Sequence, residues 1–113
     1  MDVSLIIYAA TDMDAAKRFF RELTGSDPYV ESKPYVGYKS GGMEIGLVPN
    51  DGKLEPGGLA YWDVSDIAAS VKALVDAGGT VVTDIKDVGY GLLVASVREP
   101  NGSLVGLRQP PKG

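Results

Sequence analysis

Few side-chain types in this sequence could perform acid–base or metal chemistry. None of its 113 residues is His or Cys. Their absence excludes disulfides, thiol nucleophiles, His-based triads and the imidazole or thiolate ligand sets of zinc, copper, nickel and non-haem iron. An all-oxygen site for Mg²⁺, Ca²⁺ or Mn²⁺ remains open. Any proton transfer must come from Asp, Glu, Lys or Tyr.

The charge balance and the hydropathy limit the kinds of binding partner that we expect. Eleven Lys and Arg against fifteen Asp and Glu give a net charge of -4. A surface of this sign repels phosphate backbones, so we expect no nucleic-acid partner. No apolar run approaches the roughly 20 residues that span a bilayer. Asp2 also stands where a signal peptide carries positive charge. We therefore expect no membrane partner and a cytoplasmic protein.

The first half of the chain predicts a strand, a helix and three short strands. Residues 4–10 are apolar and Ile-rich, which is typical of a strand. Asp12 is placed to cap a helix, and Gly25 to end it. The expected apolar face of that helix recurs every three or four residues, at Met13, Ala16, Phe20 and Leu23. The three strands are expected over residues 28–31, 35–39 and 43–48.

The second half repeats this plan. Residues 50–58, NDGKLEPGG, carry turn dipeptides at both ends and predict a linker. A strand over 59–64 precedes Ser65-Asp66, which opens a helix that Gly78-Gly79 closes. The apolar face of this helix is expected at Ile67, Val71, Leu74 and Val75. Three strands follow, over 80–86, 92–97 and 104–108, and a turn at 99–102 makes the last two a hairpin.

The two halves also match residue by residue. Thr11-Asp12-Met13 corresponds to Ser65-Asp66-Ile67, and Ile45-Gly46-Leu47 corresponds to Val105-Gly106-Leu107. We therefore predict one α+β domain built from two β-α-β-β-β modules, because one module alone could cover only one face of its sheet. Module 1 is expected over about residues 1–49 and module 2 over about 59–109. The alternative is an unrelated α+β domain whose internal similarity is accidental.

Three stretches resemble the vicinal oxygen chelate superfamily. This superfamily includes glyoxalase I, extradiol dioxygenases, fosfomycin-resistance enzymes and bleomycin-resistance proteins. The stretches are Ala10–Asp14 with Phe19-Phe20, Val64–Ile67 with Leu74–Gly79, and Arg98–Leu107. They span residues 4 to 109 in the family's order. The resemblance implies a mixed-sheet half-barrel around a central cavity.

The family's four metal-ligand positions depart from its pattern here. The family places His, Gln or Glu at two opening-strand and two closing-strand positions. In this sequence those positions fall on Leu5, Gly46, Leu59 and Gly106, none of which can bind a metal through its side chain. The resemblance is therefore to the metal-free, bleomycin-resistance-like branch, with no metal and no cofactor. We expect two leucines and two glycines to make a dry, open cavity floor.

Residues beside those four positions complete the expected lining. Strand side chains alternate between the two faces of a sheet. Counting from the four positions gives a mostly apolar set: Leu5, Ile7, Glu44, Gly46, Leu59, Tyr61, Asp63, Gly106 and Arg108. Tyr38 and Tyr90 are further candidates, although the sequence does not fix their facing or that of Tyr35. Tyr90, between two glycines, suits either a lid at the cavity mouth or a surface turn.

Each polar candidate has a structural alternative. Tyr61 could stack on a planar ligand or be a core aromatic residue. Glu44 and Asp63 could pair with a cationic ligand, or lie solvated or in an ion pair with Arg108. Arg108 could clamp a carboxylate or phosphate, or serve only in that pair. Trp62 should face the helix and the core.

The sequence is consistent with three functions. The first is a metal-independent binding protein that sequesters a small, partly aromatic molecule. The second is a metal-independent isomerase or lyase that uses Asp63 or Glu44 as base. The third is a non-catalytic interaction subunit. The resemblance also implies a homodimer, formed edge to edge or by exchange of modules.

Overall fold

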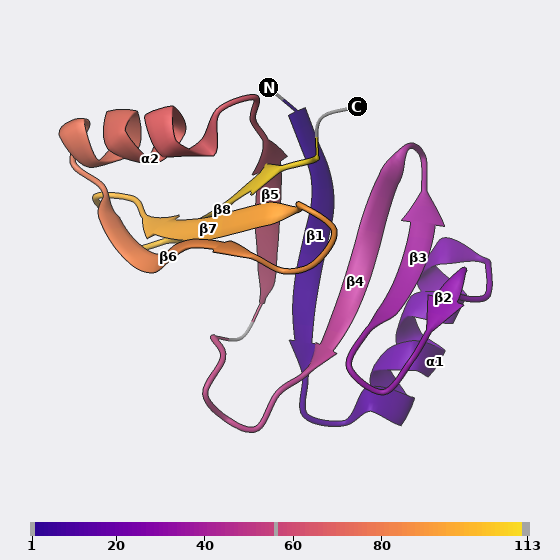
Figure 1. The fold of residues 1–113 in the computed structure, drawn as a ribbon. Coiled ribbons are helices and arrows are strands. Elements are labelled where there is room, and N and C mark those ends of the chain that lie inside the picture. Colours follow the sequence, from indigo (N-terminus) through magenta and orange to yellow (C-terminus); the bar gives the residue numbers. More distant parts are fainter. Residues whose placement is uncertain (1, 56, 112–113) are drawn as a thin grey trace. The chain divides into compact units, whose positions relative to one another are not determined.

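The computed structural model describes residues 2–55 and 57–111 and divides into two compact units (Figure 1). The N-terminal unit is Ser4–Leu59, and the C-terminal unit is Ala60–Gly113 together with Met1–Val3. The chain runs through strand, helix and three strands, and then through the same series again. This order confirms the predicted α+β class and the repeated β-α-β-β-β plan.

The N-terminal unit packs one helix on a four-strand arrangement. Its elements are β1 Asp2–Ala10, α1 Met13–Thr24, β2 Val30–Glu31, β3 Val36–Ser40 and β4 Met43–Pro49. The strands follow the order β2-β3-β4-β1, with β1 parallel to β4 and the other neighbours antiparallel. The first of the three short strands begins at Val30 and is shorter than predicted, and Pro28, which has no N–H to donate to a ladder, lies outside it.

Helix α1 begins and ends as its sequence predicts. The Ala15 N–H donates to Asp12 Oδ1 at 3.0 Å, and Gly25 ends the helix in the left-handed conformation with φ of 73°. Phe20 packs against the core of the sheet. Leu23 does not share that position and is 68% exposed. At 100° per residue it lies about 60° around the helix from Phe20, at the edge of the buried stripe.

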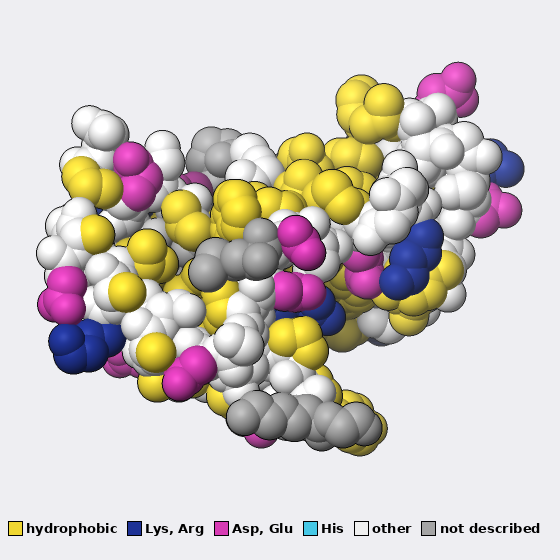
Figure 2. All heavy atoms as spheres, turned by 90° about the horizontal axis from the view of Figure 1, so that it is seen from above, with side chains coloured by type: hydrophobic (Ala, Val, Ile, Leu, Met, Phe, Trp, Pro, Cys, Tyr) yellow, Lys and Arg dark blue, Asp and Glu magenta, His cyan; other side chains and the backbone are white. Residues whose placement is uncertain are grey.

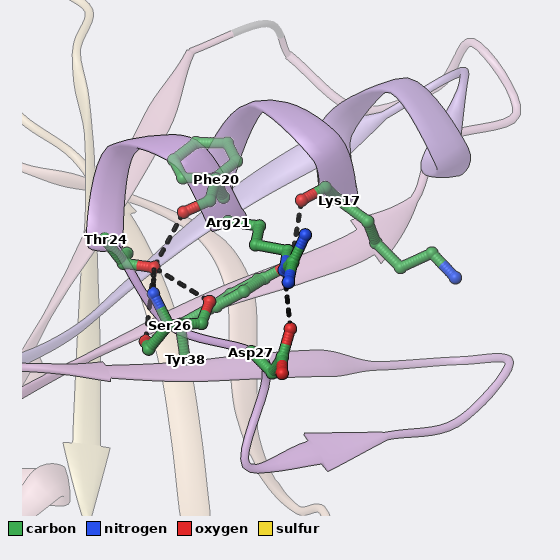
Figure 3. Close-up of polar contacts among 7 residues, drawn as sticks. All are labelled: Lys17, Phe20, Arg21, Thr24, Ser26, Asp27 and Tyr38. Atoms are coloured by element: carbon green, nitrogen blue, oxygen red, sulfur yellow. Dashed lines mark hydrogen bonds and ion pairs between the residues drawn. The ribbon is translucent and has the colours of Figure 1, made fainter.

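Tyr38 fixes α1 to the sheet. Its side chain is 0% exposed and forms a core cluster with Val36 and Leu47. Its hydroxyl donates to the Lys17 carbonyl of α1 at 3.1 Å (Figure 3). Burial raises the pKa of Tyr38 above its ordinary value. The placement of Tyr38 in the ligand site was therefore wrong, because its strand turns it toward the helix.

The C-terminal half of α1 is held by further polar contacts in the same close-up (Figure 3). Thr24 Oγ1 donates to the Phe20 carbonyl at 2.7 Å. Arg21 Nε donates to Asp27 Oδ1 at 2.6 Å, although both side chains are largely exposed. The first contact lies within the helix, and the second ties its last turns to the segment that leads into β2.

The C-terminal unit follows the same plan. Its elements are β5 Gly58–Asp63, α2 Ile67–Asp76, β6 Thr80–Asp87, β7 Leu93–Arg98 and β8 Leu104–Gln109. The strands follow the order β5-β8-β7-β6, with β5 parallel to β8. Asp66 caps α2 by accepting from the Ala69 N–H at 3.1 Å. Gln109 Oε1 accepts from the Ile67 N–H at 2.8 Å, which joins the start of α2 to the end of β8.

The core of this unit lies between α2 and the sheet. Val64, Ile67, Ala95 and Leu107 form its buried cluster. Trp62 has Leu107 as its register partner and so shares the helix side, as predicted. Its side chain is nevertheless 38% exposed, so the expectation of a core tryptophan was wrong.

The surface gives two further findings. Among the described residues, neither helix has both the length and the apolar character that crossing a bilayer requires. On the face seen in Figure 2, acidic, basic and hydrophobic side chains are intermixed, and the basic ones form no continuous patch there.

Candidate ligand-binding faces

In the N-terminal unit, the predicted lining residues share the sheet face that points away from α1. The register pairs Leu5 with Glu44 and Ile7 with Gly46. Leu47, next to Gly46 on β4, belongs to the core under α1. Because side chains alternate along a strand, these four residues lie on the opposite face. We call the face that points away from the helix, in either unit, its helix-free face.

The ring of Tyr35 covers Gly46. A Cβ on Gly46 would lie 2.5 Å from both Cε1 and the hydroxyl oxygen of Tyr35, and 2.7 Å from Cδ1 of Ile7. Such distances are far inside van der Waals contact. The expected open floor is therefore wrong at this position, because a tyrosine fills the space that the missing side chain leaves.

Glu44 is held by the same tyrosine. The Tyr35 hydroxyl donates to Glu44 Oε2, and Lys39 Nζ lies 3.7 Å from Glu44 Oε1. The Glu44 side chain is 19% exposed, whereas that of Lys39 is 65% exposed. The carboxylate is thus half-buried and engaged at both oxygens, which suits a positioning role or a hydrogen bond to a ligand more than free solvation.

The C-terminal unit also places its predicted lining residues on its helix-free face. The register pairs Tyr61 with Gly106 and Asp63 with Arg108. Leu107, between Gly106 and Arg108, points into the core under α2. Leu59 precedes Tyr61 by two residues on β5 and so has the same facing.

Tyr61 covers Gly106 as Tyr35 covers Gly46. A Cβ on Gly106 would lie 2.6 Å from Cδ1 of Tyr61 and 2.8 Å from its Cε1. The open floor is again absent. Burial raises the pKa of the Tyr61 phenol above its ordinary value of 10.0. The phenol therefore stays a hydrogen-bond donor throughout the neutral range.

Asp63 and Arg108 form the ion pair that the sequence left open. Arg108 Nη1 lies 3.2 Å from Asp63 Oδ1, with side chains 27% and 32% exposed respectively. A pair this close to solvent contributes about 0–1 kcal/mol to stability. Its contribution is therefore mainly to orient the guanidinium on the helix-free face.

Tyr90 lies apart from the other candidates. It is fully exposed on the loop between β6 and β7. Its φ of 56° is left-handed, between Gly89 and Gly91 with φ of 124° and 81°. A non-glycine residue in this conformation is uncommon. The role of Tyr90 as a lid stays a prediction, and its present position is that of a surface turn.

A hollow near one candidate residue borders α2. It is an open groove of about 680 Å³ that includes Asp63, Asp66 and Ala69. Asp66 there already serves as the helix cap, and Asp63 is engaged by Arg108. A smaller apolar hollow of about 100 Å³ lies near Leu74 and Pro100. Neither coincides with the glycine positions of the helix-free faces.

The residues at the four family positions do not fit a metal ion. Leu5, Gly46, Leu59 and Gly106 offer no side-chain oxygen, nitrogen or sulfur atom. Tyrosine rings fill the space beside both glycines. Across residues 2–55 and 57–111, no three acidic side chains come together as a set that could hold an ion.

Two residues of these faces were missed by the sequence analysis. Tyr35 precedes β3, and its facing depends on a register that the sequence did not supply. Ser96 lies opposite Gly106 on the helix-free face of the C-terminal unit and is 6% exposed. A single serine in the otherwise apolar segment Leu93–Val97 was the available signal for it.

Two β-α-β-β-β modules, each with a closing-strand glycine on its helix-free face, define a glyoxalase-like protein. The family model of the Glyoxalase/Bleomycin resistance protein/Dioxygenase superfamily matches residues 3–107, and the chain belongs to that superfamily. Among curated proteins, no sequence matches this chain.

Several solved structures share the fold at low sequence identity. A glyoxalase/bleomycin resistance protein/dioxygenase superfamily member from Vibrio splendidus 12B01 is 19% identical, with a TM-score of 0.74 over 94% of this chain and 97% of that one. Methylmalonyl-CoA epimerase from Mycobacterium tuberculosis is 17% identical, with a TM-score of 0.71 over 97% and 88%. A structure described as NAD-dependent benzaldehyde dehydrogenase from Legionella pneumophila is 11% identical, with a TM-score of 0.74 over 95% and 98%. Such different descriptions on one fold mean that function must be argued from the site.

Proposed function

We propose that this protein is a metal-independent small-molecule-binding protein that sequesters a small, partly aromatic ligand on its helix-free faces. One observation carries the proposal. Both glycines at family metal positions are covered by tyrosine rings, Gly46 by Tyr35 and Gly106 by Tyr61. An aromatic ring at each position replaces ion coordination by stacking and hydrogen bonding.

The composition of the faces supports binding of an organic molecule. Leu5 and Ile7 supply half-buried apolar surface in the N-terminal unit, and Leu59 and Tyr61 are half-buried on β5. Glu44 and the Asp63–Arg108 pair add a few fixed polar groups. Small-molecule sites are commonly of this kind, with apolar surface and a few placed polar atoms.

The second candidate function is a metal-independent isomerase or lyase. The observation that favours it is the half-buried Glu44 carboxylate with the Tyr35 hydroxyl on it, since a carboxylate base next to a phenol could move a proton and stabilise an oxyanion. The epimerase among the similar structures keeps this candidate open. Loss of turnover in a Glu44→Gln, Asp63→Asn double variant, with ligand binding retained, would favour it over sequestration.

A non-catalytic interaction subunit is the third candidate. Phe19 and Leu23 lie one turn apart on α1 and are 63% and 68% exposed. A partner protein could cover them, and a second copy of the chain is the partner we propose, in a homodimer. Light scattering at micromolar concentration tests this, and a monomer would contradict it. We also propose that the protein is cytoplasmic.

Thermal unfolding with a panel of planar aromatic compounds tests the proposed function. Stabilisation should grow with the logarithm of compound concentration, because ligand binds only the folded state. The shift should be unchanged after dialysis against EDTA, and chromatography should recover the compound intact. Conversion of the compound to product would overturn sequestration. A shift that disappears with EDTA and returns with Mg²⁺ or Mn²⁺ would overturn metal independence.

A further inference from the structure

Each unit has one row of residues that crosses its four strands on the helix-free face and passes through the site glycine. In the C-terminal unit, consecutive register partners make the row Tyr61, Gly106, Ser96 and Thr83. In the N-terminal unit they make the row Ile7, Gly46, Gly37 and Val30. The two rows occupy equivalent places in the repeat but differ in chemistry.

The row of the N-terminal unit is filled by its own side chains. Besides the Tyr35 ring on Gly46, a Cβ on Gly37 would lie 2.9 Å from Cγ1 of Val30 and 3.0 Å from Cε1 of Tyr29. Both glycines of this row are buried. Two aromatic rings thus cover this row, as Tyr61 covers Gly106 in the other unit, but the row of the N-terminal unit has no polar side chain of its own.

The row of the C-terminal unit carries three hydroxyls around one glycine. Among the described residues, Ser96 is a buried polar residue, with 6% of its surface exposed. Within residues 2–55 and 57–111, no hydrogen bond joins Ser96 Oγ or Tyr61 Oη to another residue. Ser96 Oγ is not among the fully buried side-chain atoms of these residues that lack a partner, so a water or a ligand atom can still reach it. The Tyr61 ring lies over Gly106, which is the register partner of Ser96 on the neighbouring strand.

Resting on the proposed function, we infer that the row Tyr61, Gly106, Ser96 and Thr83 receives the planar group of the ligand, and that the ligand bears an uncharged oxygen that hydrogen-bonds to this row. A carbonyl or hydroxyl oxygen fits because all three side chains are neutral donors and acceptors. A charged group fits less well, since the row contains no ion to neutralise it. The nearby charges, Asp63 and Arg108, already pair with each other.

The test follows the amide signals of isotope-labelled full chain while two matched probes are added. Acetophenone carries a ring and a carbonyl oxygen, and ethylbenzene has nearly the same shape without that oxygen. Acetophenone should shift the amide signals of Tyr61, Ser96 and Gly106 and bind more tightly than ethylbenzene. Benzylammonium, which is charged, should bind more weakly than acetophenone.

Two serine-to-alanine variants separate the hydroxyl from general effects. Ser96→Ala should weaken acetophenone binding by about 2- to 10-fold, the loss of one hydrogen bond, and leave ethylbenzene binding unchanged. Ser40→Ala, at an exposed position on β3, should change neither. Unchanged acetophenone affinity in Ser96→Ala, with amide signals as dispersed as those of the natural chain, would overturn the inference.

The outcomes distinguish this inference from the function on which it rests. If probe-induced shifts centre on Ile7, Gly37 and Gly46, the inference fails while small-molecule binding stands. If acetophenone does not bind but another panel compound does, the shifts caused by that compound decide between the rows in the same way. If no aromatic compound binds the natural chain, the proposed function and the inference both fail.

Discussion

Tyr35 lies across Gly46, so close that a Cβ at residue 46 would come within 2.5 Å of both the ring and the hydroxyl of the tyrosine. The resemblance to the superfamily places residue 46 at a metal-ligand position, and a tyrosine ring packs in the space beside it. Tyr61 and Gly106 repeat the relationship in the second unit.

Gly46→Ala should destabilise the protein by about 1–3 kcal/mol, the range for overpacking a filled site. Urea unfolding measures this. In a Tyr35→Ala background the same substitution should cost less, because the ring that it strikes is gone. An unchanged unfolding midpoint for Gly46→Ala alone would show that the ring does not occupy the space beside residue 46.

Ser96→Ala should leave stability nearly unchanged, because Ser96 Oγ makes no hydrogen bond to another described residue and still touches solvent. The control is Ser40→Ala, which should be neutral. Thermal or urea unfolding checks both variants. A clear loss of stability in Ser96→Ala would mean that the hydroxyl is paired in solution.

Tyr38→Phe should destabilise the protein by about 0.5–1.5 kcal/mol, since it deletes the hydrogen bond to the Lys17 carbonyl while keeping the ring in the core. Tyr90→Phe is the matched control, because the Tyr90 side chain is fully exposed. Its unfolding midpoint should not move. Equal effects in the two variants would contradict the buried position of Tyr38.

Much of the fold could be predicted from local sequence signals. Asp12 and Asp66 cap their helices as expected, and Gly25 ends α1. These signals act within a few residues, so the sequence displays them directly. The sheet faces of Leu5 and Tyr61 could also be predicted locally, because side chains alternate between the two faces along a strand.

The rest of the site depended on register between strands. Tyr38 was a candidate for the ligand site, and Tyr35 was left without a facing. In the structure Tyr38 packs in the core under α1, and the Tyr35 ring covers Gly46. Their facing depends on how β3 pairs with β4, which no local pattern encodes. The covering of both glycines escaped prediction for the same reason, since it requires knowing which side chain lies over a residue on a neighbouring strand.

The Tyr61 phenol should titrate above its ordinary value of 10.0, because burial opposes its ionisation. A pKa that is raised in the folded state contributes stability that is full below the unfolded value, about 10. That contribution is lost as pH rises through the folded pKa. Tyrosinate absorbance of the natural chain minus that of Tyr61→Phe isolates this group. A midpoint at or below 10.0 would contradict its burial.

Under the proposed function, the tyrosine rings over Gly46 and Gly106 take the place of ion coordination. Titration of Mn²⁺ into the EDTA-dialysed, isotope-labelled chain tests it directly, because a bound paramagnetic ion broadens the amide signals around it. We predict broadening only near exposed carboxylates, with no saturation at stoichiometric ion. Selective broadening at Leu5, Gly46, Leu59 and Gly106 that saturates at about one ion per chain would contradict the account.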